Sequence, residues 1–182
     1  PNPGSMRTCA PDDAPVWLTR HDNPRRKLIY TWELVQVDDA MVCVNTTRAN
    51  PLIEEALRAA RIDRLAGYRE LRREVTLDTG SRIDFMLRGP DGARDARCYV
   101  EVKSVTLRTG EREAAFPDGV TTRGTRHLME LMRAVRLGHR AVLLFCVNRS
   151  GVAWIRPADE IDPHYGQALR EAARQGVELL AY

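Results

Sequence analysis

The strongest constraint on the fold is residues 141–147, an unbroken run of seven apolar side chains. A strand with one face in water alternates apolar and polar residues, whereas a strand that is apolar at every position needs cover on both faces. Seven residues also fall far short of the roughly 20 that a membrane-spanning helix needs. The run therefore predicts a central strand of a sheet that lies between helices, which is a mixed α/β fold.

Helix patterns occur on both sides of this run. Asn50 as an N-cap with Pro51 at the first helical position predicts one helix, and residues 121–137 repeat apolar side chains at helical spacing. Asp162 followed by Pro163 predicts the start of a last helix. The order expected from residue 50 is helix, three strands, helix, strand, helix and strand. The strands are expected at residues 71–77, 82–87, 97–107, 141–147 and 177–181, with a loop at 108–120 and a continuation of the sheet at 154–155.

The first 45 residues show a different pattern, in which Pro-rich loops separate short β-like runs. Asp38 and Asp39 predict a turn between the second and third runs. Two or three strands are only marginally stable alone, so we expect part of a small barrel or sheet that begins upstream. The expected domains are residues 1–45 and 46–182. The runs themselves lie at residues 16–18, 28–37 and 41–44.

Cysteine, histidine and hydropathy patterns narrow the class of protein. The four cysteines form no C-x-x-C pair and are expected to be reduced thiols of a cytoplasmic protein. The four histidines lack the spacing of zinc ligands, and no apolar run is long enough to cross a membrane. We therefore expect neither a zinc site nor a membrane partner.

Basic residues are informative by position rather than by number. Lys and Arg total 28 against 25 Asp and Glu, so the net charge of +3 alone indicates no polyanionic partner. Arg20, Arg25 and Arg26, however, lie close in sequence to three aromatic residues. Because phosphate contacts and base stacking act together, this cluster is a candidate nucleic-acid surface. The alternative is a solvated loop above a core that contains the tryptophans.

Two neighbouring strand patterns carry the candidate chemistry. In one of them Glu101 and Lys103 point to one face of the strand while valines point to the other. In the other, Asp84 points away from the apolar face. If these strands pair as a hairpin with their apolar faces aligned, Asp84, Glu101 and Lys103 gather on one surface. The apolar face expected in the strand that contains Asp84 consists of Ile83, Phe85 and Leu87.

Two carboxylates beside an ammonium group suit metal-assisted chemistry. Mg²⁺ is typically held by one or two carboxylates, keeps several waters and takes phosphate oxygens as further ligands. Asp84 and Glu101 would bind the ion, and Lys103 would orient the attacking water or stabilise the transition state. Lys103 is one of only two lysines among 28 basic residues, and an ammonium does not replace a guanidinium freely. The alternative is a solvated strand face with a surface ion pair.

The carboxylates and the lysine, placed within this order of helices and strands, resemble the PD-(D/E)xK nuclease superfamily. Longer blocks are similar to the sugar fermentation stimulation protein A family. Ile83 stands where the superfamily name has proline, at a position outside the chemistry. The blocks lie at residues 1–6, 30–34, 43–46, 81–87, 98–107, 116–118 and 121–128.

The resemblance implies an OB-like N-terminal domain, present only in part, followed by a nuclease-like domain. It also implies Asp84 and Glu101 as metal carboxylates, Lys103 as the catalytic lysine and Glu55 as the glutamate of the first helix. Mg²⁺ or Mn²⁺ is the metal that we expect. The nucleic-acid contacts that we expect are Arg20, Arg25, Arg26, Arg82, Arg123, Arg126 and His127.

Two functions follow from this resemblance. The first is a DNA-binding protein with a nuclease-like metal site, without sequence specificity and linked to the regulation of sugar (maltose) metabolism. The second is an active Mg²⁺- or Mn²⁺-dependent nuclease that hydrolyses phosphodiester bonds. An intact set of Asp84, Glu101 and Lys103 is compatible with both, because a nuclease fold can serve recognition alone.

Overall fold

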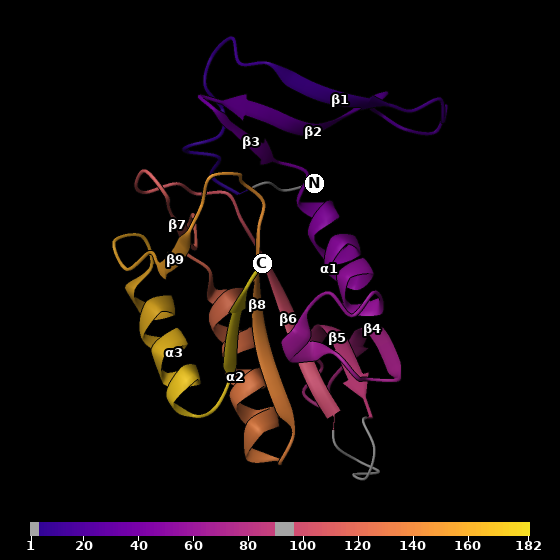
Figure 1. Cartoon of the computed structure of the whole chain (residues 1–182), viewed down its shortest axis with the longest axis vertical. Coiled ribbons are helices and arrows are strands. Elements are labelled where there is room, and N and C mark those ends of the chain that lie inside the picture. The colour runs from indigo at the N-terminus through magenta and orange to yellow at the C-terminus, as the bar shows by residue number, and fades with distance from the viewer. Residues whose placement is uncertain (1–3, 90–96) are drawn as a thin grey trace.

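The computed structural model describes residues 4–89 and 97–182, and the first three residues of the 1–6 block lie outside this part of the chain. A three-stranded sheet lies at one end of the molecule, and a larger α/β unit with a five-stranded sheet forms the rest (Figure 1). The mixed α/β fold expected from the sequence is confirmed. No helix in the described residues is long and apolar enough to cross a membrane.

The small sheet is antiparallel and has the order β1-β2-β3, with β1 at Val16–Arg20, β2 at Tyr30–Val37 and β3 at Ala40–Cys43. The predicted turn joins β2 to β3, and Asp38 adopts a left-handed conformation there, with φ of 53°. The last strand of this sheet also contacts the larger unit. Val42 forms an antiparallel bridge with Arg149, and the Cys43 backbone N–H donates to Asn148 O at 2.8 Å.

The large sheet has the order β10-β8-β6-β5-β4. The apolar run forms β8 (Arg140–Val147), which pairs in parallel with β6 (Arg97–Val105) and β10 (Glu178–Ala181). β5 (Arg82–Arg88) and β4 (Glu70–Thr76) continue the sheet in antiparallel pairing. The pairing of β5 with β6 is the one that the carboxylate hypothesis requires.

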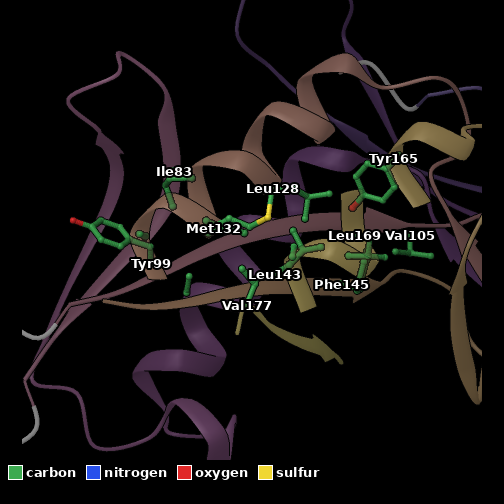
Figure 2. Packing of buried hydrophobic residues seen from close by; sticks show 14 of the residues in the cluster. Ile83, Tyr99, Val105, Leu128, Met132, Leu143, Phe145, Tyr165, Leu169 and Val177 are labelled. Atoms are coloured by element: carbon green, nitrogen blue, oxygen red, sulfur yellow. The ribbon is translucent and has the colours of Figure 1, made fainter. Parts of the chain in front are cut away.

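Helices cover both faces of this sheet, as the apolar run predicts. Leu143 and Phe145 face α2 (Thr122–Arg136) and α3 (Pro163–Arg174), where Figure 2 shows the packed side chains. Val142 and Leu144, which alternate with them, pack in the cluster that contains α1 (Ala49–Arg58). Each face of β8 therefore lies in its own core. At about 25 cal/mol per Å² of apolar surface removed from water, this burial is the main stabilising contribution to the fold.

The start of α1 differs from the prediction. Asn45, not Asn50, is the capping residue: its side chain accepts from the Thr47 backbone N–H and starts a 3₁₀ turn, Thr46–Arg48, that leads into α1. Asn50 lies inside the first helical turn. Pro51 is tolerated beside it because backbone N–H groups in the first turn have no partner within the helix.

The region after β6 also differs from the prediction. Residues 108–120 were expected as a loop, but β7 (Glu113–Phe116) forms within them and pairs in parallel with β9 (Trp154–Pro157). Residues 154–155 therefore do not continue the large sheet. The reason is that β10 pairs with β8 along the edge that β9 would need.

Candidate active site

Asp84 lies where the pairing between β5 and β6 stops. The ladder runs from the pair Arg88 and Arg97 to the pair Phe85 and Val100. At the next position the Asp84 carboxylate accepts a hydrogen bond from the Val102 backbone N–H, Oδ2 to N at 2.8 Å. The side chain of Asp84 thus satisfies a donor that an uninterrupted sheet would pair with a backbone carbonyl.

This break corrects one expectation about β5. Ile83, Phe85 and Leu87 were predicted to share one apolar face, but Ile83 packs in the core of α2 and α3 while the other two pack with α1. A regular strand would keep Ile83 with Phe85. The strand is irregular here, because Glu74 on β4, opposite the break, has a φ of 51°. Asp84 remains close enough to Glu101 for the charge of that carboxylate to raise its pKa.

Asn50 is a site residue that the sequence reasoning missed. Its amide nitrogen donates to Asp84 Oδ1 at 2.8 Å, so both carboxylate oxygens of Asp84 accept a hydrogen bond. Burial raises the pKa of Asp84 above its ordinary value, the negative charge of Glu101 raises it further, and the two hydrogen bonds oppose the shift. From the sequence alone Asn50 resembles a helix N-cap, because the polar residue types that cap helices also form hydrogen bonds elsewhere in a structure.

Glu101 is the most buried charged residue of the site, with 2% of its surface exposed. Its Oε1 accepts from Lys103 Nζ at 2.8 Å and forms a short contact with His127 Nδ1. Burial alone would raise the pKa of Glu101, but the hydrogen bond from His127 and the charge of Lys103 outweigh it and hold that pKa below its ordinary value. The second oxygen, Oε2, is buried without a hydrogen-bond partner among the described residues.

His127 comes from α2 and is buried, with 4% of its surface exposed. Arg123 Nε donates to its Nε2 at 3.4 Å, so Nε2 is an acceptor and the proton on Nδ1 faces Glu101, with Lys103 Nζ 3.2 Å from the same nitrogen. His127 was expected to contact nucleic-acid phosphate. The structure places it against Glu101, where α2 packs on β6, one helical turn from the exposed Arg123.

The first-helix glutamate does not join this cluster. Glu55 is exposed, and its position lies on the side of α1 opposite the buried Ile53, which is two residues away and thus about 200° round the helix. Its neighbour Glu54 forms ion pairs with Arg58 and Arg73. α1 therefore contributes Asn50, rather than Glu55, to the site.

The arginines predicted to bind nucleic acid lie in three separate groups. Arg123 and Arg126 are exposed on α2, and Arg123 is hydrogen-bonded to His127, which contacts Glu101. Arg82 is exposed on β5 and pairs with Glu74 at 2.8 Å. The third group is exposed on the hairpin of β1 and β2 in the small sheet and consists of Arg20, Arg25 and Arg26.

The donor set suits one class of metal. Asp84 and Glu101 are the carboxylates available, and the described residues contain no group of three or more His, Cys, Asp or Glu side chains that could hold an ion. Two carboxylates, one with a buried free oxygen, fit a hard cation that keeps several waters and binds phosphate oxygens. They do not fit a structural zinc ion, which takes four protein ligands.

Models of protein families match almost the whole chain. Residues 47–182 match the sugar fermentation stimulation protein RE domain, and residues 1–44 match the SfsA N-terminal OB domain. The chain is 56% identical over 185 residues to the sugar fermentation stimulation protein homolog of Pseudomonas paraeruginosa, covering 100% of this chain and 77% of that protein. The homolog from Thioalkalivibrio sulfidiphilus is 53% identical over 182 residues and is covered to 75%.

A solved structure is similar as well. SfsA from Pyrococcus furiosus in complex with Ca²⁺ superposes with a TM-score of 0.81 and 28% sequence identity. The match covers 91% of this chain and 68% of that protein. The similarity therefore includes most of both the small sheet and the α/β unit.

Proposed function

We propose, from the premise that this chain belongs to the sugar fermentation stimulation protein family, that it binds DNA through a metal site formed by Asp84 and Glu101. The observation that carries the proposal is Glu101 Oε2, a buried carboxylate oxygen without a partner in the described structure. Such an atom costs about 1–3 kcal/mol unless something binds it, and more when the group is charged. The family name connects the chain with sugar fermentation, and DNA binding would be its means of regulation.

The metal that we propose is Mg²⁺ or Mn²⁺. When bound, it would neutralise phosphate charge and lower the pKa of a coordinated water. Burial and the charge of Glu101 raise the pKa of Asp84, and the positive charge of the ion would lower it again. The Pyrococcus furiosus protein was solved with Ca²⁺, another hard cation that prefers oxygen ligands.

Arg123 and Arg126 would bind the phosphates that flank the metal. Both are exposed on α2, and Arg123 is tied to the carboxylate cluster through His127. Guanidinium groups bind phosphate oxygens in a forked geometry that suits a nucleic-acid backbone. Contacts of this kind carry no base information, so the proposed binding is insensitive to sequence and weakens as salt rises.

Lys103 favours a second candidate function, which is hydrolysis of the bound phosphodiester. Its side chain is 12% exposed and its ammonium lies 2.8 Å from Glu101 Oε1. A lysine that only paired with a surface carboxylate would be more exposed and replaceable by arginine. In a nuclease Lys103 would orient the attacking water and stabilise negative charge on the phosphate, while His127 keeps Glu101 ionised and in place.

Calorimetric titration of Mg²⁺, Mn²⁺ and Ca²⁺ tests the metal site. Asp84→Asn and Glu101→Gln should abolish binding, and Glu55→Gln, a matched change on the exposed side of α1, should leave it unchanged. Retained Mg²⁺ and Mn²⁺ binding in both site variants would refute the assignment. DNA binding is tested separately by fluorescence anisotropy over a range of salt, where affinity that is insensitive to salt would rule out the phosphate contacts.

Incubation of the metal-loaded protein with DNA separates the two functions. Cleavage by the wild type that is lost in Lys103→Met, with Mg²⁺ binding retained, would support the nuclease. Binding without cleavage by either protein would restrict the function to recognition.

A further inference from the structure

The loop between β1 and β2 exposes two aliphatic side chains. Leu28 is 70% exposed and Ile29 is 53% exposed. The β1–β2 ladder ends at the pair Arg20 and Tyr30, and the bond from the His21 backbone N–H to Ile29 O extends the pairing by one residue, so Leu28 and Ile29 lie where the paired strands open into the loop. Figure 1 shows this loop extending away from the rest of the molecule, past α1. Its tip is therefore open to a large partner.

The same segment concentrates positive charge. Residues 20–29 hold four basic side chains and one acidic side chain, a net charge of +3. The whole chain also has a net charge of +3, so the charges of all other residues balance. Arg25 and Lys27 are both exposed beside the aliphatic pair. The charge selects a polyanion as the partner.

Hydrogen bonds within the loop hold this arrangement in place. Arg26 Nη2 donates to Thr31 Oγ1 at 2.9 Å, and its Nε donates to Leu28 O at 3.3 Å. The His21 backbone N–H donates to Ile29 O at 2.8 Å. A loop that is ordered by its own contacts loses little conformational entropy when it binds a partner, so its two apolar side chains are preorganised for binding.

We infer that this loop is a wedge for double-stranded DNA, in which Leu28 and Ile29 insert between base pairs and Arg25 and Lys27 contact the flanking phosphates. Apolar side chains flanked by basic ones are the means by which minor-groove proteins unstack a base step and bend the duplex. The inference rests on the proposed DNA binding and adds to it the form of DNA and a distortion. Exposed apolar side chains gain by leaving water, and the phosphate contacts offset the cost of unstacking.

Two double variants of the full chain test the wedge. Leu28→Ser with Ile29→Ser removes the apolar pair and keeps the charge, whereas Arg25→Ser with Lys27→Ser removes charge and keeps the pair. All four side chains are exposed, so both proteins should fold and bind Mg²⁺ as the wild type does. The probes are a duplex that contains 2-aminopurine, whose fluorescence rises on unstacking, and a duplex labelled at both ends for energy transfer.

The wild type should raise 2-aminopurine fluorescence severalfold and shorten the end-to-end distance of the duplex. The serine pair at 28 and 29 should lose both signals while it still binds duplex. The charge variant should weaken binding and reduce the slope of log affinity against log salt by about two, since about 0.9 counterions are released per phosphate contact.

Four results would overturn the wedge. Duplex binding by the wild type without either signal would refute the wedge and leave the proposed DNA binding standing. If the 2-aminopurine and energy-transfer signals persist in the variant at 28 and 29, the wedge is likewise refuted and the proposed DNA binding stands. A third result has two parts: the wild type binds phosphatidylglycerol vesicles and the variant at 28 and 29 does not, while the duplex stays undistorted. That result would assign the loop to a membrane surface. Failure of the wild type to bind any DNA would overturn both proposals together.

Discussion

Replacement of His127 by leucine should destabilise the protein by about 2 kcal/mol, because it removes a hydrogen bond to the ionised carboxylate of Glu101, a class of bond worth about 1.5–3 kcal/mol. Leucine fills a similar volume in this 4% exposed position and recovers part of the loss through apolar burial. For a chain of 182 residues, about 2 kcal/mol corresponds to a fall in Tm of about 4–8 °C.

Urea unfolding at pH 7, followed by tryptophan fluorescence, measures this loss. Two variants serve as controls. Arg123→Ala removes the exposed partner of His127 and should change the free energy of unfolding by less than about 0.5 kcal/mol. His127→Asn offers an amide N–H near the place of Nδ1–H and should keep Mg²⁺ affinity closer to wild type than His127→Leu, which should lose about 10–100-fold. Equal stability of His127→Leu and the wild type would refute the view that this bond holds Glu101 in place.

Further predictions concern charge and packing. Burial and the charge of Glu101 raise the pKa of Asp84, so above that pKa the ionised form of Asp84 lowers the stability of the folded protein. Asp84→Asn should therefore raise the Tm of the metal-free protein and abolish the further rise in Tm with Mg²⁺. A lower Tm of the metal-free variant would contradict this. For the same reason Mg²⁺ affinity, measured by calorimetry, should begin to fall at a higher pH than for an ordinary aspartate. Gly124→Ala places a Cβ 2.8 Å from Thr121 Cγ2 and 3.1 Å from Tyr165 Cε2, and denaturation should show a loss of about 1–3 kcal/mol. Lys103→Arg should fold less stably, since a guanidinium does not fit the 12% exposed position; unchanged urea unfolding would show that the site accepts either cation.

The sequence was sufficient for the features that depend on periodicity. The apolar run of β8 identified a strand covered on both faces, and alternation along β6 placed Glu101 and Lys103 on the same side. Both inferences use only the two-residue repeat of a strand. The OB and RE domains of the family models also agree with the family resemblance recognised from the sequence blocks.

Features that depend on tertiary contacts could not be predicted in this way. Asn50 bonds Asp84 because α1 packs against β6, and nothing in the local sequence of α1 specifies that partner. Ile83 departs from the alternation of β5 because the ladder stops at Asp84. His127 looks like an exposed phosphate contact until the approach of α2 to β6 is known. Each error comes from a neighbour distant in the sequence.

The contact between β3 and the segment after β8 has a consequence for the spacing of the two proposed DNA surfaces. The bridge of Val42 with Arg149 and the bond from Cys43 to Asn148 join the small sheet to the strand that adjoins β6. A backbone junction of this kind allows little hinge motion, in contrast to a free linker. If both proposed surfaces bind one duplex, this junction would fix the number of base pairs between the step contacted by the β1–β2 loop and the phosphate at the proposed metal site.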